Sequence, residues 1–216
     1  MVKSDRIQSR GEELANAFTH ALGAALGVAG LAVLVTAAAR RGDAWKVVSF
    51  SVFGATMVLL YTMSTLYHLA TNERVKKFLH ILDHASIFLL IAGTYTPVSL
   101  VTMRGVWGWS IFGVVWGIAA VGIILKIFFT GKYRAASTIL YLAMGWIIVV
   151  AIKPLLTLMP PAGLYWFLAG GLSYSFGTIF YMWKSLWFAH AVWHLFVLGG
   201  TVCHFFGVYY QILPMS

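Results

Sequence analysis

Two histidines one helical turn apart are the feature of this sequence that most directly suggests chemistry. His190 and His194 are separated by three residues, so in a helix both imidazoles would share one face. Two imidazoles on one face can bind a zinc ion, and catalytic zinc sites commonly have three protein ligands and one position open to water. The pair alone is weak evidence, because buried histidines also form hydrogen bonds between helices.

His68 is the candidate third ligand, and Asp83 is the candidate acid–base group. His68 ends the string Ser64-Thr65-Leu66-Tyr67-His68, in which Ser64 lies one turn earlier on the same helical face. Asp83 is the only acidic residue clearly within an apolar segment. It could orient or deprotonate a water at the metal, or it could complete the site as a fourth protein ligand. The first arrangement predicts a catalytic site and the second a structural one, and both stay open.

A stripe of polar residues near the N-terminus could support this site. Glu13, Asn16 and His20 have the spacing of one helical face. The stripe could be a capped, partly solvated first turn, or it could be a polar support beneath the metal.

The remaining histidines are predicted to lie outside the ligand set. His84 points about 100° away from Asp83 around a helix, so we expect it to pack beside the site. His80 is expected at an interface or in a hydrogen bond. His204 lies about 15 Å from His194 along a helix axis, too far to share one ion, and is predicted to form a hydrogen bond between helices.

The elements that would position these residues are membrane helices. The chain has 216 residues, of which 61% are hydrophobic and 10% charged, against about 25% charged in a typical soluble domain. Its 16% of aromatic residues suits interfacial belts, and its one cysteine excludes an intramolecular disulfide. The net charge of +9 comes from basic residues spread thinly at segment ends. This predicts contact with anionic membrane lipids and no nucleic-acid partner.

Seven apolar runs reach the length of about 20 residues that a helix needs to cross a bilayer. Short polar or helix-breaking segments separate them, so neighbouring helices should be antiparallel. The sequence therefore predicts an all-α, polytopic seven-helix bundle that forms one membrane domain over residues 1–216, with residues 1–15 as a polar cytoplasmic segment. The predicted spans are residues 16–39, 45–69, 79–101, 106–129, 135–158, 162–183 and 187–210.

The distribution of basic residues predicts the orientation. With the N-terminus in the cytoplasm, ten of the 15 Lys and Arg residues fall on the inner side and five on the outer side. Seven spans then place the C-terminus outside. The same orientation brings the polar residues of four separate spans to the cytoplasmic side. Pro97 and Pro154 could kink the third and fifth helices and open a cavity, or each could be a tolerated bend.

Taken together, these motifs resemble those of the haemolysin III family, which belongs with the progestin and adipoQ receptors, including the adiponectin receptors. The resemblance runs from Glu13 to beyond His204, nearly the whole chain, and it is closest to the bacterial branch. It is carried by Glu13-x-x-Asn16-x-x-x-His20, Ser64-x-x-x-His68, Leu82-Asp83-His84 and His190-x-x-x-His194. Two longer strings agree with it, Ala92-Gly93-Thr94-Tyr95-Thr96-Pro97 and the run from His190 to Gly200.

The resemblance implies a seven-helix protein of the bacterial inner membrane with a cytoplasmic N-terminus. It implies that His68, His190 and His194 bind Zn²⁺, with Asp83 holding a nearby water and Ser64 close by. Adiponectin receptors and the related alkaline ceramidases are linked to zinc-dependent hydrolysis of a lipid amide. Bacterial members carry an old label as haemolysins and an association with membrane lipid homeostasis.

Three classes of function follow from these observations. A zinc-dependent hydrolase acting on a lipid amide, or a lipid homeostasis factor, would use Asp83 to move the proton and Ser64 to help stabilise the oxyanion. A cytolytic or pore-forming protein is the second class, and a receptor-like protein with a structural zinc ion is the third. Three imidazoles would also suit copper or nickel. The residues name neither the substrate nor the oligomeric state.

Overall fold

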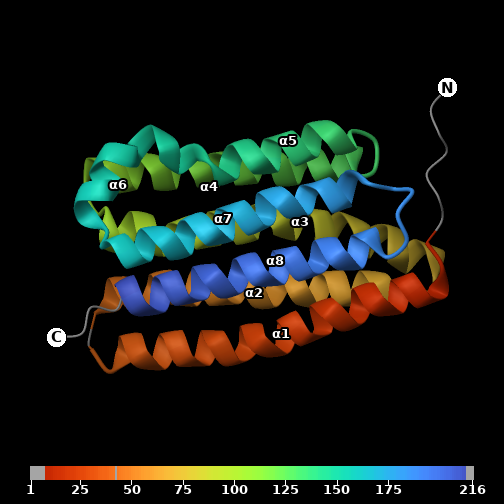
Figure 1. Ribbon diagram of the computed structural model, residues 1–216, viewed down its shortest axis with the longest axis horizontal. Coiled ribbons are helices and arrows are strands. Elements are labelled where there is room, and N and C mark those ends of the chain that lie inside the picture. Colours follow the sequence, from red (N-terminus) through yellow and green to blue (C-terminus); the bar gives the residue numbers. More distant parts are fainter. Residues whose placement is uncertain (1–7, 42, 213–216) are drawn as a thin grey trace.

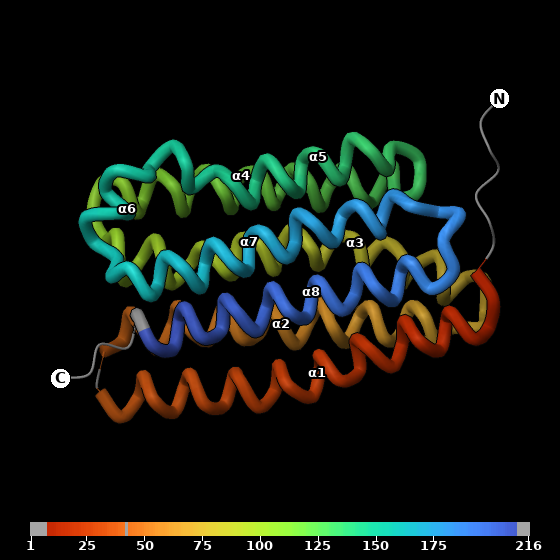
Figure 2. The backbone as a smooth tube through the Cα atoms, viewed as in Figure 1, coloured from red at the N-terminus to blue at the C-terminus, as the bar shows by residue number. Residues whose placement is uncertain are grey.

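The computed structural model describes residues 8–41 and 43–212, and within them every regular element is helical (Figures 1 and 2). The long helices lie roughly side by side along one axis, which is the arrangement expected of a membrane bundle. The α-helices are α1 (Arg10–Ala39), α2 (Ala44–Leu69), α3 (Glu73–Pro97), α4 (Val106–Phe129), α5 (Arg134–Gly145), α6 (Ile152–Leu158), α7 (Pro161–Met182) and α8 (Ala189–Gly207). Two π-helical segments, η1 (Val98–Thr102) and η3 (Val208–Ile212), and a 3-10 segment, η2 (Ile147–Ala151), extend them.

The predicted all-α membrane protein is confirmed. Within the described chain, six helical stretches are long and apolar enough to cross a membrane. They are Arg10–Ala39, Ala44–Leu69, Glu73–Thr102, Val106–Phe129, Arg134–Leu158 and Ala189–Tyr210. The seventh predicted span corresponds to α7, which lies alongside these helices but is not among the six (Figure 1). Its apolar residues are interspersed with glycine, serine and tyrosine.

The first helix begins earlier than predicted. α1 starts at Arg10 rather than at residue 16, because Ser9 and Glu12 form a capping box. The Ser9 hydroxyl accepts a hydrogen bond from the Glu12 backbone N–H (3.3 Å), and the Glu12 carboxylate accepts one from the Ser9 N–H (2.9 Å). The residues from Arg10 onward in the predicted polar segment 1–15 are therefore helical, and residues 1–7 lie outside the described part of the chain.

The third and fifth spans are irregular near the two prolines. α3 passes into the π-helical segment η1 directly after Pro97. The predicted fifth span, 135–158, is three elements instead of one helix, because α5 ends at Gly145, η2 follows, and α6 contains Pro154. A proline has no N–H to continue the helical hydrogen bonds of the preceding turn.

Tyr95 stabilises the interruption in the fifth span. Its hydroxyl donates to the carbonyl of Gly145 (2.7 Å) and accepts from the N–H of Ile148 (3.0 Å). Irregular backbone at membrane depth is tolerated where protein satisfies its polar groups or where it lines a cavity. Tyr95 and Gly145 also line two cavities, so the interrupted part of the span borders the internal cavities of the bundle.

Small residues allow α2 to approach both of its neighbours closely. α2 packs along α1 and α3, α7 packs along α8, and α1 also contacts α8. A Cβ atom at Gly23 of α1 would lie 2.5 Å from the ring of Tyr61, and one at Gly93 of α3 would lie 2.1 Å from the Thr56 hydroxyl. Such contacts between small residues and a neighbouring helix drive packing in lipid. They fix the helices that carry the polar residues of the site.

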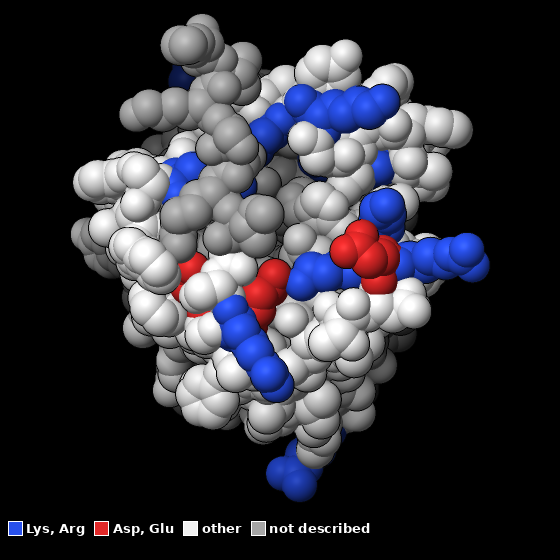
Figure 3. Space-filling model, turned by 90° about the vertical axis from the view of Figure 1, so that its right-hand side faces the viewer, with Lys and Arg blue, Asp and Glu red and all other residues white. Residues whose placement is uncertain are grey.

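The bundle has apolar sides and a charged end, as expected of a protein that spans a membrane. Large apolar side chains are exposed along the sides of the bundle; Phe18 and Val150, for example, are each 73% exposed. The end of the bundle where α1, α3, α5 and α8 begin carries Lys and Arg residues around a few acidic ones (Figure 3). This end is called the polar end below, and it contains the candidate site.

Candidate metal centre

The three predicted ligands meet at the polar end. One ligand nitrogen from each of His68, His190 and His194 lies within 4.8 Å of the others. His68 comes from the end of α2, and the other two come from the first turns of α8. Ring centroids are 4.6 Å apart for His190 and His194 and 5.1 Å apart for His68 and His194. Residues far apart in sequence thus form one compact set of nitrogen donors.

A divalent metal ion fits this donor set. Nδ1 of His68 donates to the Glu13 carboxylate, whereas its buried Nε2 has no hydrogen-bond partner among the described residues. A buried polar atom without a partner carries a desolvation cost that a bound ligand would remove. Three imidazole nitrogens are a common protein contribution to zinc, and they leave one coordination position open.

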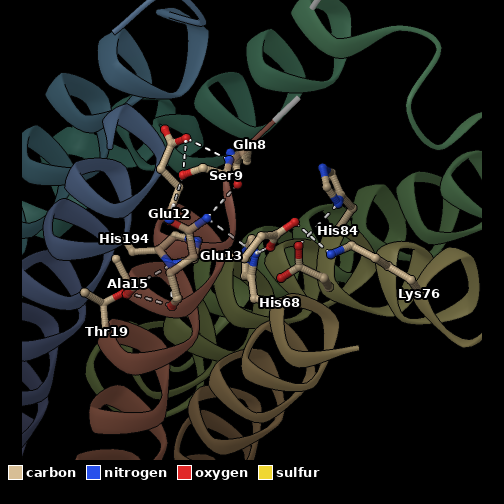
Figure 4. Close-up of polar contacts among 12 residues, drawn as sticks. Gln8, Ser9, Glu12, Glu13, Ala15, Thr19, His68, Lys76, His84 and His194 are labelled. Atoms are coloured by element: carbon tan, nitrogen blue, oxygen red, sulfur yellow. Dashed lines mark hydrogen bonds and ion pairs between the residues drawn. The ribbon is translucent and has the colours of Figure 1, made fainter. Parts of the chain in front are cut away.

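Glu13 orients His68 (Figure 4). Its carboxylate accepts from Nδ1 of His68 (2.6 Å) and from Nζ of Lys76 (2.7 Å). A proton held on Nδ1 leaves the lone pair on Nε2, the nitrogen with no partner of its own. A carboxylate behind a metal-binding histidine fixes the tautomer and raises its basicity.

The rest of the predicted stripe on α1 lies against His194. Nδ1 of His194 donates to the backbone carbonyl of Asn16 (3.1 Å) and lies 3.2 Å from the Thr19 hydroxyl. His20 stacks on His194 with ring centroids 3.4 Å apart and an interplanar angle of 11°. Asn16 and His20 are buried against the imidazoles, whereas the Glu13 side chain is partly exposed.

Asp83 and Ser64 lie beside the three histidines without joining the compact donor set. Asp83 is 8% exposed and lines the same cavity as His190 and His194. The Ser64 hydroxyl is near the Asp83 carboxylate, but it is not in hydrogen-bonding geometry with it. This placement favours a group that acts next to a metal ion over a fourth ligand.

His84 lies next to Asp83 and lines the same cavity. Its Nδ1 lies 3.0 Å from the carbonyl of His80 and 3.5 Å from the Asp83 carboxylate. Its Nε2 is 3.3 Å from the hydroxyl of Tyr181. His80 itself stacks on Tyr67 at a centroid distance of 5.0 Å. These contacts place the two histidines outside the donor set.

Two adjoining cavities lie between the site and the opposite end of the bundle. The first, of about 120 Å³, is lined by Asp83, His190 and His194 and otherwise mostly by apolar side chains of α3, α5, α7 and α8. The second, of about 430 Å³, lies between the ends of α3 and α7 and the interrupted fifth span. They share six lining residues, Thr94, Tyr95, Gly145, Trp146, Gly171 and His204. Asp83, His190 and His194 therefore line a mostly apolar cavity that reaches His204.

Sequence reasoning missed Glu12. Its carboxylate accepts from the backbone N–H of Phe188 (3.1 Å), two residues before His190. Phe188 has a left-handed backbone conformation (φ 56°), which is uncommon for a bulky residue. Glu12 thus holds the start of α8 against α1. The Ser9-x-x-Glu12 pattern indicates the capping role, but no local signal indicates the contact with Phe188.

Lys76 and Thr19 were also missed. Each touches a group of the site only because separate helices pack together, so the sequence around them carries no signal of their role.

Replacing Glu13 by alanine is expected to weaken zinc binding by roughly 10- to 100-fold, because His68 loses the carboxylate that fixes its tautomer. Competition with a chelator of known affinity would measure this change. The matched control is Glu73→Ala, which removes an exposed carboxylate from the same end of the bundle and should leave the affinity unchanged. Equal affinities for Glu13→Ala and the unmodified chain would show that this contact does not tune the site.

Comparison with known proteins gives a consistent match over nearly the whole chain. A family model described as haemolysin-III related matches residues 8–205, a range that includes every candidate site residue from Glu13 to His204. The chain is 50% identical to Hemolysin-3 of Bacillus cereus (95% of this chain, 94% of the relative). It is 47% identical to the Hemolysin-3 homolog of Bacillus subtilis strain 168 (94% and 96%). It is 26% identical to the human monocyte to macrophage differentiation factor (92% and 83%).

Proposed function

Because this chain belongs to the haemolysin-III-related family, and is a multi-pass bacterial membrane protein, we propose that it is a zinc-dependent hydrolase of a membrane lipid amide. One observation carries the proposal. Three histidine nitrogens gather within 4.8 Å of one another beside a buried aspartate, at the end of an apolar cavity. A lipid with a polar amide and an acyl chain matches both parts of this space. Such an activity would make the protein a factor in membrane lipid homeostasis.

In the proposed reaction, Asp83 moves the proton. A zinc ion bound by His68, His190 and His194 would supply Lewis acidity at the amide carbonyl and activate water. The Asp83 carboxylate takes a proton from the attacking water and returns it to the leaving amine. The hydroxyl of Ser64, which has no hydrogen-bond partner among the described residues, donates to the oxygen on which negative charge develops.

The buried position of the site keeps bulk water away from the reacting groups. Asp83 is 8% exposed and His194 is 2% exposed. In a site of low polarity, charged groups interact more strongly than they do in water. The apolar walls of the two cavities hold the acyl chain, whose transfer from lipid to these walls costs little because both are hydrocarbon.

We also propose that α7 is the seventh span and that the N-terminus is cytoplasmic. α7 has 22 residues, a length of about 33 Å at 1.5 Å per residue, which is enough to cross the hydrocarbon core. Alkaline phosphatase fused to the C-terminus is expected to be active, since that reporter works only outside the cytoplasm. A fusion at Gly131, between α4 and α5, is the inactive control. The opposite pattern would reverse the orientation.

A cytolytic role is the second candidate, and the name of the Bacillus cereus relative favours it. A hydrolase would cleave the lipid and release fatty acid, whereas a cytolysin would make the bilayer permeable. The test is to incubate zinc-loaded and chelator-treated protein with ceramide and with dye-filled vesicles. Zinc-dependent release of fatty acid supports the hydrolase. Dye release without fatty acid, and without dependence on zinc, would replace it with the cytolytic role.

A further inference from the structure

His204 occupies the junction of the two cavities. The residue is 9% exposed, and it is among the residues that line both the cavity that contains Asp83 and the larger cavity beyond it. It lies on α8, ten residues after His194, which places it about 15 Å farther along the helix axis. The proposed reaction does not use it.

The neighbouring helix leaves space for this imidazole. A Cβ atom at Gly170 of α7 would lie 2.2 Å from Cδ2 of His204 and 2.4 Å from its Nε2. The ring sits between the aromatic rings of Phe167 and Tyr174, each at a centroid distance of 5.3 Å. A bulkier residue at position 170 would displace the ring, so the packing of α7 on α8 fixes its position.

One nitrogen of His204 is bound and the other is not. Nε2 donates to the backbone carbonyl of Phe167 (3.2 Å), so in this tautomer Nδ1 is a hydrogen-bond acceptor. Nδ1 is buried and has no partner among the described residues. A buried acceptor without a partner is costly, and it is rare in proteins unless a water or a ligand meets it.

The other buried polar groups around the junction are already paired within the chain. The Tyr95 hydroxyl bonds the backbone of the interrupted span, and the indole N–H of Trp146 donates to Ser175 (3.0 Å). The Tyr174 hydroxyl lies 2.8 Å from the hydroxyl of Thr201, and the Thr94 hydroxyl donates to the Leu90 carbonyl (2.8 Å). Among the described buried residues that line the second cavity, His204 is therefore the one with an unmet polar side-chain atom.

We propose that His204 is a second polar binding site, whose Nδ1 accepts a hydrogen bond from an uncharged donor, a hydroxyl group, on the chain of a bound lipid. An uncharged donor is favoured because a charged one would be far costlier to place among apolar walls. The distance of about 15 Å from His194 corresponds to roughly a dozen bonds of an extended chain. The inference takes from the proposed function that the cavities hold an acyl chain. It does not require that the lipid be hydrolysed.

Fatty acids that differ by one hydroxyl group test this site directly. Zinc-loaded protein in detergent would be titrated with octadecanoate, 12-hydroxyoctadecanoate and 3-hydroxyoctadecanoate, each displacing a fluorescent fatty acid. The 12-hydroxy acid is expected to bind about 5-fold more tightly than octadecanoate, the gain typical of one net hydrogen bond. The 3-hydroxy acid should show no gain through His204, because its hydroxyl would lie near the metal-binding end.

Two variants complete the experiment. His204→Phe should bind octadecanoate as the unmodified chain does and lose the preference for the 12-hydroxy acid. His80→Phe, which changes a histidine that lines neither cavity, should keep the preference. Equal dissociation constants for octadecanoate and its 12-hydroxy derivative in the unmodified chain would overturn the proposal, whatever the variants do. A failure to hydrolyse ceramide would leave this binding result unaffected, so the two proposals fail separately.

Discussion

Replacing His190 or His194 by alanine is expected to remove the metal from the purified protein, which should otherwise hold about one zinc ion per chain. Each substitution takes away one of three nitrogen donors that lie within 4.8 Å of one another. Asp83 is not part of that set, and among the described residues no carboxylate joins the three imidazoles in it. Elemental analysis of protein prepared without added chelator would give both the identity and the amount of the metal.

A histidine elsewhere on the same helix provides the control. His204→Ala removes an imidazole from α8 about 15 Å away, and it should leave the metal content unchanged. Copper or nickel in place of zinc would keep the site but revise its chemistry. An unmodified chain that holds no metal would contradict the site itself, and the histidines would then serve as hydrogen-bonding groups between helices.

Metal removal also separates a catalytic ion from a structural one. A ligand that binds only the folded protein stabilises it, so chelation should lower the melting temperature in either case. If the ion is catalytic, the chelated protein should stay folded and should regain hydrolysis when zinc is returned. A chain that unfolds irreversibly on chelation would favour the receptor-like alternative with structural zinc.

Replacing Asp83 by asparagine is expected to lower ceramide hydrolysis by about 100-fold or more while zinc stays bound. Asparagine has nearly the same shape as aspartate, but it cannot accept the proton of the attacking water. The prediction depends on the position of Asp83, which lines the cavity next to His190 and His194 but lies outside the compact donor set. Initial rates of fatty acid release, with zinc content measured on the same samples, would test it.

Asp43→Asn is the matched control for this change. Asp43 caps the start of α2 at the opposite end of the bundle, and asparagine is an equally good capping residue. Full activity of Asp83→Asn would exclude Asp83 as the acid–base group. Loss of zinc together with activity would instead identify Asp83 as a fourth ligand, the closed arrangement that the sequence also allowed.

Much of the site could be predicted because its residue types are unusual in their surroundings. Charged and imidazole side chains are costly within apolar spans, so Asp83 and His68 are conspicuous wherever the chain folds. The spacing of His190 and His194 follows from helical geometry alone. The roles of Glu12, Lys76 and Thr19 could not be predicted, because each depends on a contact between helices that are distant in sequence.

Some helix boundaries could likewise be predicted from the local sequence, and others depend on contacts between helices. The fifth span lies where its apolar length predicted it, but the predicted continuous helix is interrupted after Gly145, where Tyr95 of α3 stabilises the break. That break is stabilised by hydrogen bonds from another helix, and the apolar length of the span does not predict it. The start of α1 is encoded locally by the capping box of Ser9 and Glu12, a signal that the length of the apolar run does not contain.

The sequence by itself determined the helical membrane class of this protein, its family and the candidate ligands. Those properties depend on composition, on apolar length and on spacing within single helices, all of which are local. Only the tertiary structure decided that three histidines meet, that α1 orients two of them, and that an apolar space leads from Asp83 to His204. These depend on how helices pack, and packing in lipid is set by small residues and hydrogen bonds between helices.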